Sequence, residues 1–315
     1  MIVALAGGVG GAKLAQGLAR ARPPGDLTVV INTADDFDLY GLRICPDLDT
    51  VLYTLAGIAD PTTGWGIAGD THHAMDAIAG YGRDPWFRLG DRDLATHVLR
   101  TERLRDGSSL STVTAEFAAA LGVATALVPM SDERVATLVD TPAGRLEFQD
   151  YFVARRQQDV VTGVVFDGVE AARPAPAVAE SLADATLIVF CPSNPIVSIG
   201  PILAVPGLRD LIAKCPAPKI AVSPIVGGRA LKGPADRMLA SLGFESSALG
   251  VAKMYAGLVD AIVIDDEDAA LAPAIREGGM RVLVTQTVMG GPEDRERLAA
   301  EVIGFGLGRE RGGGR

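Results

Sequence analysis

A glycine-rich segment near the start of the chain has the clearest potential to bind a ligand. Residues 7–13 read GGVGGAK, follow an apolar run and precede a helical pattern. Glycines allow the backbone to approach a ligand closely, and the first turn of a helix offers free N–H groups and a partial positive charge. The segment therefore predicts a seat for a phosphate group. It departs from both GxxxxGKS/T and GxGxxG, so a plain strand-to-helix turn remains the alternative.

Several carboxylates at the starts of expected helices could bind a divalent cation or orient a hydroxyl group. Asp47 and Asp49 belong to the string PDLDT, which precedes the apolar-periodic stretch VLYTLAGI. Asp70 in WGIAGDT and the pair Asp91 and Asp93 in GDRD also precede expected helices. Magnesium binds one or two protein carboxylates together with phosphate oxygens and water, so these residues could hold it or orient an attacking hydroxyl. Each could equally cap a helix.

Other catalytic chemistries find little support. His72 and His73 are adjacent and have no third ligand at suitable spacing, which disfavours a zinc site. His97 follows Asp93 by four residues, so a same-face pair on a helix is expected. The chain contains no GxSxG string, which disfavours a serine hydrolase. Its three cysteines form no CxxC pair and are expected to be reduced and structural.

The elements that must position these residues follow an alternating pattern. Short apolar runs separated by helical stretches are typical of a parallel sheet with helices on both faces. We expect strands at 2–6, 27–32, 186–195, 219–228, 261–268 and 281–287. The sequence therefore predicts an α/β fold, Rossmann-like and doubly wound, with a mainly parallel sheet and a helix-rich insertion. We expect one compact unit over 1–315, with its core from 1–50 and 160–305, a helix-rich cap at 50–121 and mixed strands at 124–160.

Two later loops are expected at the same edge of this sheet. PSNP at 192–195 and SPIVGG at 223–228 each follow an expected strand. Ligands of open α/β sheets bind at the carboxyl ends of the strands, so these loops and the glycine segment favour a nucleotide cleft. Ordinary turn chemistry is the alternative for both.

The composition disfavours nucleic acid and membranes as binding partners. The formal net charge is −10 and no long Lys/Arg block occurs, which disfavours nucleic-acid binding. No apolar run reaches the roughly 18 residues of a membrane span, and the N-terminus lacks the basic region of a signal peptide. We therefore expect a cytoplasmic protein without a membrane partner.

Taken together, the strings resemble the 2-phospho-L-lactate transferase family, the CofD-type transferases of coenzyme F(420) biosynthesis. The resemblance extends to about Asp268 and rests on GGVGGAKL, PDLDTVLYTL, GDRDLATH, PMSD, PSNPIVSIGPILAVPG and SPIVGG. GDRDLATH and PSNPIVSIGPI are the specific strings, whereas the glycine segment also occurs in a sister family of gluconeogenesis-factor regulators.

The resemblance implies transfer of a phospho-acid group, 2-phospho-L-lactyl, enolpyruvyl-phosphate or a related group, from a diphospho-5'-guanosine donor. The acceptor would be the 5'-hydroxyl of Fo (8-hydroxy-5-deazariboflavin), and the products F(420)-0 or dehydro-F(420)-0 and GMP. A requirement for Mg²⁺ and a homodimer are also implied.

Transferred to this sequence, the resemblance assigns site residues. For catalysis we expect Asp47 and Asp49, and for magnesium Asp47 and Asp70. Contacts to phosphate are expected from Gly8, Gly10, Gly11 and Lys13, and contacts to the donor's nucleotide from Ser193, Asn194, Ser223 and Gly227. A wall for the flat deazaflavin is expected from Trp65, Asp91 and Arg92.

Two other functions remain open at this point. A non-catalytic regulator that binds a nucleotide sugar would share the glycine segment and the fold. A nicotinamide oxidoreductase would use one of Asp35, Asp36 and Asp38 to hold a ribose after the second strand. Which acid the donor carries is not decided by any residue of the sequence.

Overall fold

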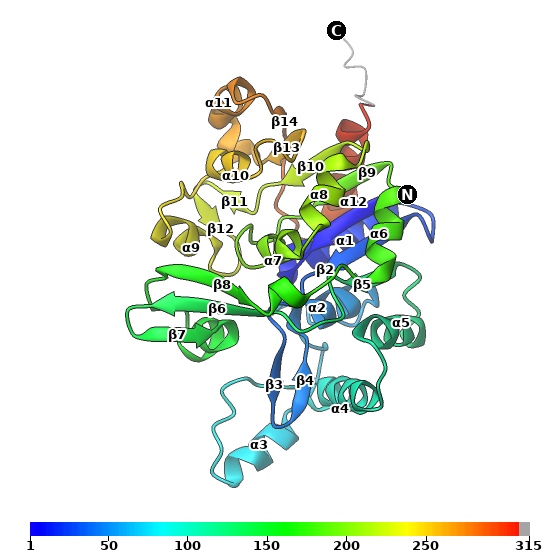
Figure 1. Ribbon diagram of the computed structural model, residues 1–315, viewed down its shortest axis with the longest axis vertical. Coiled ribbons are helices and arrows are strands. Elements are labelled where there is room, and N and C mark those ends of the chain that lie inside the picture. The colour runs from blue at the N-terminus through cyan, green and yellow to red at the C-terminus, as the bar shows by residue number, and fades with distance from the viewer. Residues whose placement is uncertain (309–315) are drawn as a thin grey trace.

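The structure is a computed structural model that describes residues 1–308. Its centre is a sheet of seven parallel strands (Figure 1). In spatial order the strands are β14 (Arg281–Val284), β13 (Ala261–Ile264), β10 (Lys219–Val222), β9 (Leu187–Phe190), β1 (Ile2–Ala6), β2 (Leu27–Ile31) and β5 (Ala126–Pro129). The strand order reverses direction between β1 and β9, so the crevice for a ligand is expected beside these two strands.

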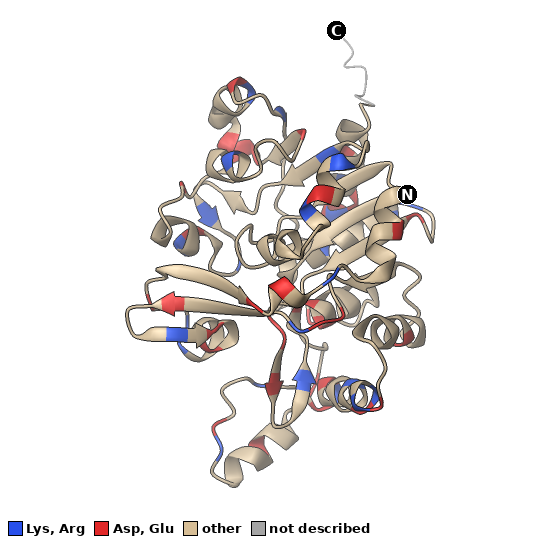
Figure 2. Cartoon of the chain, in the orientation of Figure 1, with Lys and Arg blue, Asp and Glu red and all other residues tan. Residues whose placement is uncertain are grey.

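The central strands are apolar because both faces of the sheet are covered. Lys219 and Arg281 are the charged residues of the seven strands, and each is the first residue of its strand. Figure 2 accordingly shows the central strands almost free of charge, with acidic and basic residues on helices, loops and the strands of the smaller sheets. The α/β, doubly wound fold predicted from the sequence is confirmed.

Two hydrophobic clusters lie on the two faces of the sheet. The first face packs against the helices α1 (Gly8–Ala21), α2 (Pro46–Leu55), α5 (Leu110–Ala120) and α12 (Pro292–Gly306). The second packs against α6 (Pro176–Ala183), α7 (Ile199–Ala204), α8 (Leu208–Lys214), α9 (Ala235–Ser241), α10 (Ala248–Met254) and α11 (Ala272–Glu277). A 3₁₀ helix, η3 (Asp266–Leu271), joins β13 to α11.

An extension projects from the sheet beside β2. It contains the antiparallel pair β3 (Phe37–Leu39) and β4 (Leu42–Ile44), and the helices α3 (His73–Gly80) and α4 (Asp91–Arg105). Figure 1 shows this hairpin and α3 extending away from the central sheet, with α4 beside them. A small apolar cluster that includes Phe37, Trp86 and Phe87 supports the extension.

Two smaller sheets complete the fold. One is antiparallel and contains β6 (Ala136–Thr141), β7 (Gly144–Glu147) and β8 (Gly163–Asp167). The π-helix η1 (Asp150–Ala154) lies between β7 and β8, and the 3₁₀ helix η2 (Val169–Ala171) follows β8. The other is the hairpin of β11 (Ile225–Val226) and β12 (Arg229–Ala230). The strand β5 belongs to the central sheet, whereas the sequence grouped it with the mixed strands at 124–160.

No helix within residues 1–308 is long and apolar enough to cross a membrane.

Candidate functional site

The glycine segment forms the turn from β1 into α1 at the carboxyl edge of the sheet. Gly7 is extended, and Gly8 begins the helix with a φ of +62°, a conformation that favours glycine. A Cβ on Gly10 would lie 2.3 Å from the Pro192 carbonyl oxygen, and one on Gly7 would lie 2.5 Å from an Asp47 carboxylate oxygen. The turn therefore packs so closely against the loop at Pro192 and against Asp47 of α2 that these positions have no room for a side chain.

Ser193 and Asp47 are the side chains that meet this turn. Ser193 Oγ donates to the Gly7 carbonyl oxygen at 2.8 Å and accepts from the Gly7 N–H at 3.1 Å. Asp47, in the first turn of α2, accepts from the Gly8 N–H at 2.8 Å and from Asn32 Nδ2 at 2.9 Å. A buried carboxylate thus occupies the N-terminus of α1, where an anion is favoured.

Asp47 lies beside the buried carboxylate of Asp35, which is also next to the buried Asp36 in the chain. Burial raises the pKa of Asp47 to about 6, against the hydrogen bonds from Asn32 and Gly8. Burial, followed by the negative charge of Asp47, raises the pKa of Asp35 well above its usual range. Burial also raises the pKa of Asp36, to about 7. The negative charges of Asp47 and Asp36 disfavour the ionisation of Asp35, whereas Asp36 is also near the positive charges of Arg43 and Arg100. A cation beside Asp35 and Asp47 would stabilise the ionised form of both.

The donor set of this carboxylate group fits a divalent cation. One oxygen each of Asp35 and Asp36 is buried and has no hydrogen-bond partner among the described residues. Unpaired buried oxygens are costly, and hard cations such as Mg²⁺ bind carboxylate oxygens. A cavity of about 60 Å³ adjoins Asp36, and its lining contains both acidic and basic side chains: Asp36, Asp132, Glu133, Arg43 and Arg134.

The other residues predicted to contact the donor's nucleotide lie in turns. Asn194 Oδ1 accepts from the N–H groups of Ile196 and Val197, and so holds the loop before α7. Ser223 Oγ bonds both the N–H and the carbonyl of Ile225. Gly227 occupies the exposed turn between β11 and β12 with a φ of +56°. Of the four, Ser193 is the residue bonded directly to the glycine segment.

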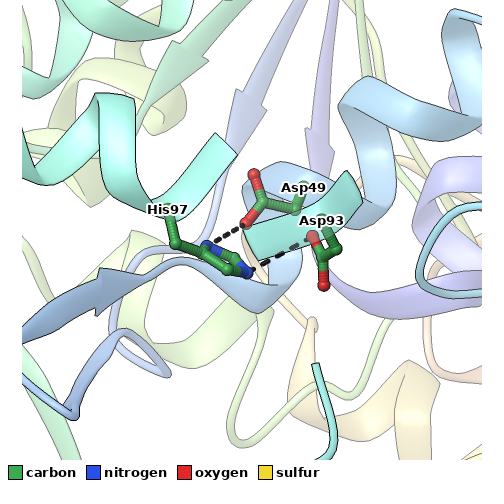
Figure 3. A group of neighbouring side chains, drawn as sticks. All are labelled: Asp49, Asp93 and His97. Carbon is green, nitrogen blue, oxygen red and sulfur yellow. Dashed lines mark ion pairs between the residues drawn. The ribbon is translucent and has the colours of Figure 1, made fainter. Parts of the chain in front are cut away.

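Asp49 lies on a different side of α2 from Asp47, since two residues along an α-helix turn through about 200°. Its carboxylate accepts two hydrogen bonds from the Arg100 guanidinium of α4, one of them at 3.0 Å. Figure 3 shows the His97 imidazole between Asp49 and Asp93, with its nitrogens 3.7 Å and 3.3 Å from their oxygens.

Tyr53 extends the same network, because its hydroxyl donates to Asp93 at 2.8 Å. We name these five residues (Asp49, Tyr53, Asp93, His97 and Arg100) the α2–α4 network. The ligand atoms of Asp49, Asp93 and His97 lie within 4.8 Å of one another, a spacing that a metal ion could bridge. Arg100 already neutralises Asp49 at hydrogen-bond distance, so we interpret the group as an ion-pair network that joins α2 to α4.

Asp70, Asp91 and Arg92 lie together at the start of α4. Asp70 accepts from the N–H groups of Thr71, Arg92 and Asp93, which satisfies orphan donors of the helix. Asp91 accepts from the Thr71 hydroxyl and two N–H groups, and these hydrogen bonds lower its pKa to about 2. The Arg92 side chain is exposed.

Trp65 and Lys13 lie beside α1. Trp65 is 50% exposed and follows Gly64, where an added Cβ would be 2.6 Å from the Val9 side chain in the first turn of α1. Lys13 Nζ donates to the Met289 carbonyl oxygen at 2.9 Å. The loop carrying Trp65 therefore packs against the glycine helix.

Two features were not foreseen from the sequence. Asp35 and Asp36 were considered as ribose ligands, whereas Asp35 lies beside Asp47 and Asp36 lies near Arg43 and Arg100. The approach of Asp49 to the pair Asp93 and His97 was also missed. The spacing of Asp93 and His97 indicated their own pairing, but no sequence signal connects them to Asp49.

The similarity of this chain to known proteins shows that it is a transferase. The sequence matches the family described as 2-phospho-L-lactate transferase CofD over residues 2–289, and the chain belongs to that family. It is 44% identical over 308 residues to the phosphoenolpyruvate transferase of Streptomyces griseus, covering 96% of this chain and 97% of that protein. It is 38% identical over 302 residues to the 2-phospho-L-lactate transferase of Methanosarcina mazei, covering 96% and 99%.

Two solved structures of the Bacillus halodurans protein BH3568, a UPF0052 family member, share the fold. Their TM-scores are 0.66 and 0.60 at 14% and 15% sequence identity. Each comparison covers 96% of this chain and 98% of that chain.

Proposed function

We propose that this protein transfers a phospho-acid group from a diphospho-5'-guanosine donor to the 5'-hydroxyl of Fo in coenzyme F(420) biosynthesis. For the acid we propose enolpyruvate, which makes the products dehydro-F(420)-0 and GMP. The choice of acid is supported by the names of the relatives, because the Streptomyces griseus and Streptomyces coelicolor proteins, each 44% identical, are phosphoenolpyruvate transferases. The Methanosarcina relatives named for 2-phospho-L-lactate are 38% and 39% identical.

The observation that carries the proposal is the Asp47 carboxylate at the phosphate seat. A carboxylate bonded to the Gly8 N–H would repel a diphosphate that approached the same helix terminus. A divalent cation between them removes this conflict, and the unpaired oxygen of Asp35 supplies a second ligand beside Asp47. Asp35 and Asp47 would therefore hold Mg²⁺, which when bound neutralises the diphosphate and stabilises the departing phosphate.

Asp70 is less suited to this role than the sequence suggested. Its carboxylate already accepts three backbone N–H groups at the start of α4. We therefore propose Asp35 in place of Asp70 as the partner of Asp47, and assign Asp49 to the support of α2 through Arg100.

The remaining task of the protein is to place the reactants in line. The Fo hydroxyl oxygen attacks the phosphorus that carries the acid, the bond to the GMP phosphate breaks, and the hydroxyl proton leaves to a base. Asp47, with a pKa of about 6, is mostly ionised at neutral pH and can accept that hydroxyl as a hydrogen-bond donor. The Gly8 N–H and the Ser193 hydroxyl already bond Asp47 and the Gly7 carbonyl. The remaining free N–H groups in the first turn of α1 would therefore orient the phosphates.

Fo is proposed to lie against the loop that carries Trp65. The half-exposed indole offers a flat apolar surface to a flat ring, and Gly64 places it next to the first turn of α1. Asp91 and Arg92, at the start of α4, remain proposed members of this wall.

The proposal is tested by mass spectrometry after mixing the protein, Fo and magnesium with the enolpyruvyl, lactyl or glyceryl donor. We expect dehydro-F(420)-0 and GMP from the first, and no product in EDTA. Asp47→Asn keeps the shape but removes the charge, and should lower the transfer rate roughly 100-fold. Asp76→Asn, on the exposed side of α3, is the matched control.

An absence of product with every donor would refute the transfer. Thermal protection by a nucleotide sugar but not by Fo would then favour a non-catalytic regulator.

A further inference from the structure

Three basic side chains gather along one side of α1. They are Lys13 on α1, Lys232 in the loop after β12, and Arg295 on α12. An added Cβ at Gly64 would lie 3.3 Å from Lys232 Nζ and 2.6 Å from Val9 Cγ1, which places the ammonium at the first turn of α1. Arg295 Nη1 donates to Gln16, which lies one turn beyond Lys13 on α1. The pKa of Lys13 is lowered by burial and then by the positive charges of Arg295 and Lys232, in agreement with this placement.

Most hydrogen-bond donors of this basic group have no acceptor within residues 1–308. Lys13 Nζ donates to the Met289 carbonyl and Lys232 Nζ donates to the Thr63 carbonyl, although an ammonium has three N–H bonds. Arg295 donates Nη1 to Gln16, while its Nε is buried and has no partner among residues 1–308. The group therefore presents donors for which the described protein offers no acceptor.

None of the three cations forms an ion pair within the described part of the chain. This is unexpected in a protein with a net charge of −10, where most clustered basic residues can find a carboxylate. Neighbouring like charges destabilise a protein unless an anion binds between them. The arrangement is that of an anion site.

We propose that Lys13, Lys232 and Arg295 bind the diphosphate of the nucleotide donor, a role that rests on the proposed function. The Lys232 end of the site adjoins the first turn of α1, so one diphosphate can contact both Lys232 and the backbone turn at Gly8. It also lies on the α12 side of α1, whereas Asp47 lies on the α2 side. A diphosphate there receives cations from one side and the carboxylate-bound metal from the other. The three cations would hold the phosphate that departs with GMP, whose negative charge increases as the bond breaks.

Calorimetric titration with GDP and GMP in magnesium buffer tests the site. We expect Lys232→Ala to weaken GDP binding about 10-fold to 100-fold, the usual effect of losing one charge-assisted contact to phosphate. GMP retains the phosphate that these cations hold, so its binding should weaken by a similar factor. Lys232→Arg should retain most of the GDP affinity. Lys253→Ala removes an exposed lysine paired with Glu245, and should leave GDP binding unchanged.

GDP affinities of Lys232→Ala and Arg295→Ala within twofold of the unsubstituted protein would overturn this inference. Product formation by the unsubstituted protein, followed by mass spectrometry, separates the two proposals. If product forms while these variants bind GDP normally, the transferase function stands and the basic site is wrong. If GDP binding weakens as expected but no donor gives product, the site stands and the proposed reaction is wrong.

Discussion

Arg100→Met should destabilise the protein strongly, because it leaves Asp49 buried without its cation. The Arg100 and Asp49 side chains are 3% and 7% exposed, and two hydrogen bonds join them. Breaking a buried pair by removing one partner costs about 3–5 kcal/mol, since the remaining charge is not solvated. The cation over the Phe117 ring, 5.8 Å from its centroid, is lost as well. We expect a loss of about 4 kcal/mol in the free energy of unfolding.

Arg103→Met provides a matched control on the same helix. Arg103 pairs with Glu116, but the two side chains are 40% and 43% exposed. Exposed pairs contribute about 0–1 kcal/mol, so this variant should be nearly as stable as the parent. Urea unfolding followed by both tryptophan fluorescence and circular dichroism measures the two differences, and coincident curves support a two-state treatment.

A second substitution separates charge burial from packing. Asp49→Asn in the Arg100→Met background removes the unpaired charge, and should recover at least half of the lost stability. Equal losses for Arg100→Met and Arg103→Met would refute the interpretation of the α2–α4 network as a buried ion-pair network.

Two further predictions concern stability. Gly10→Ala places a Cβ 2.3 Å from the Pro192 backbone oxygen and should cost about 1–3 kcal/mol in thermal unfolding, whereas Gly80→Ala, with open space at its Cβ, should not destabilise. Burial acts to raise the pKa of Asp93, but hydrogen bonds and charges from His97, Tyr53 and Arg100 outweigh it and hold the pKa below its usual range. A lowered folded-state pKa stabilises the protein above the unfolded pKa of about 4, and this contribution is lost as pH falls through the folded value. Urea midpoints should therefore separate the parent from Asp93→Asn at pH 7 and converge between about pH 4 and pH 2; a gap independent of pH would contradict the assignment.

Function-bearing loops at the carboxyl edge of a parallel sheet could be expected from the sequence alone. The apolar runs at β1, β2 and β9 and the glycines after β1 are local signals, since buried strands and tight turns have characteristic residues. Because parallel strands end at one edge, the meeting of Ser193 with Gly7 followed from the order of elements. The strand β5 was harder to place, because a four-residue strand does not indicate its partner.

Only the tertiary structure shows which acidic residues lie at the glycine turn and which form the buried ion-pair network. Asp47 and Asp49 are two residues apart and could be expected on different sides of a helix, but only packing decides which side meets the glycine turn. Asp35 joins Asp47 across a turn between different elements, and Lys232 reaches α1 from a loop more than 200 residues away. Periodicity determined which residues share a face of one helix or strand; the sheet order and the helix packing decided which faces meet, since those contacts join segments distant in the chain.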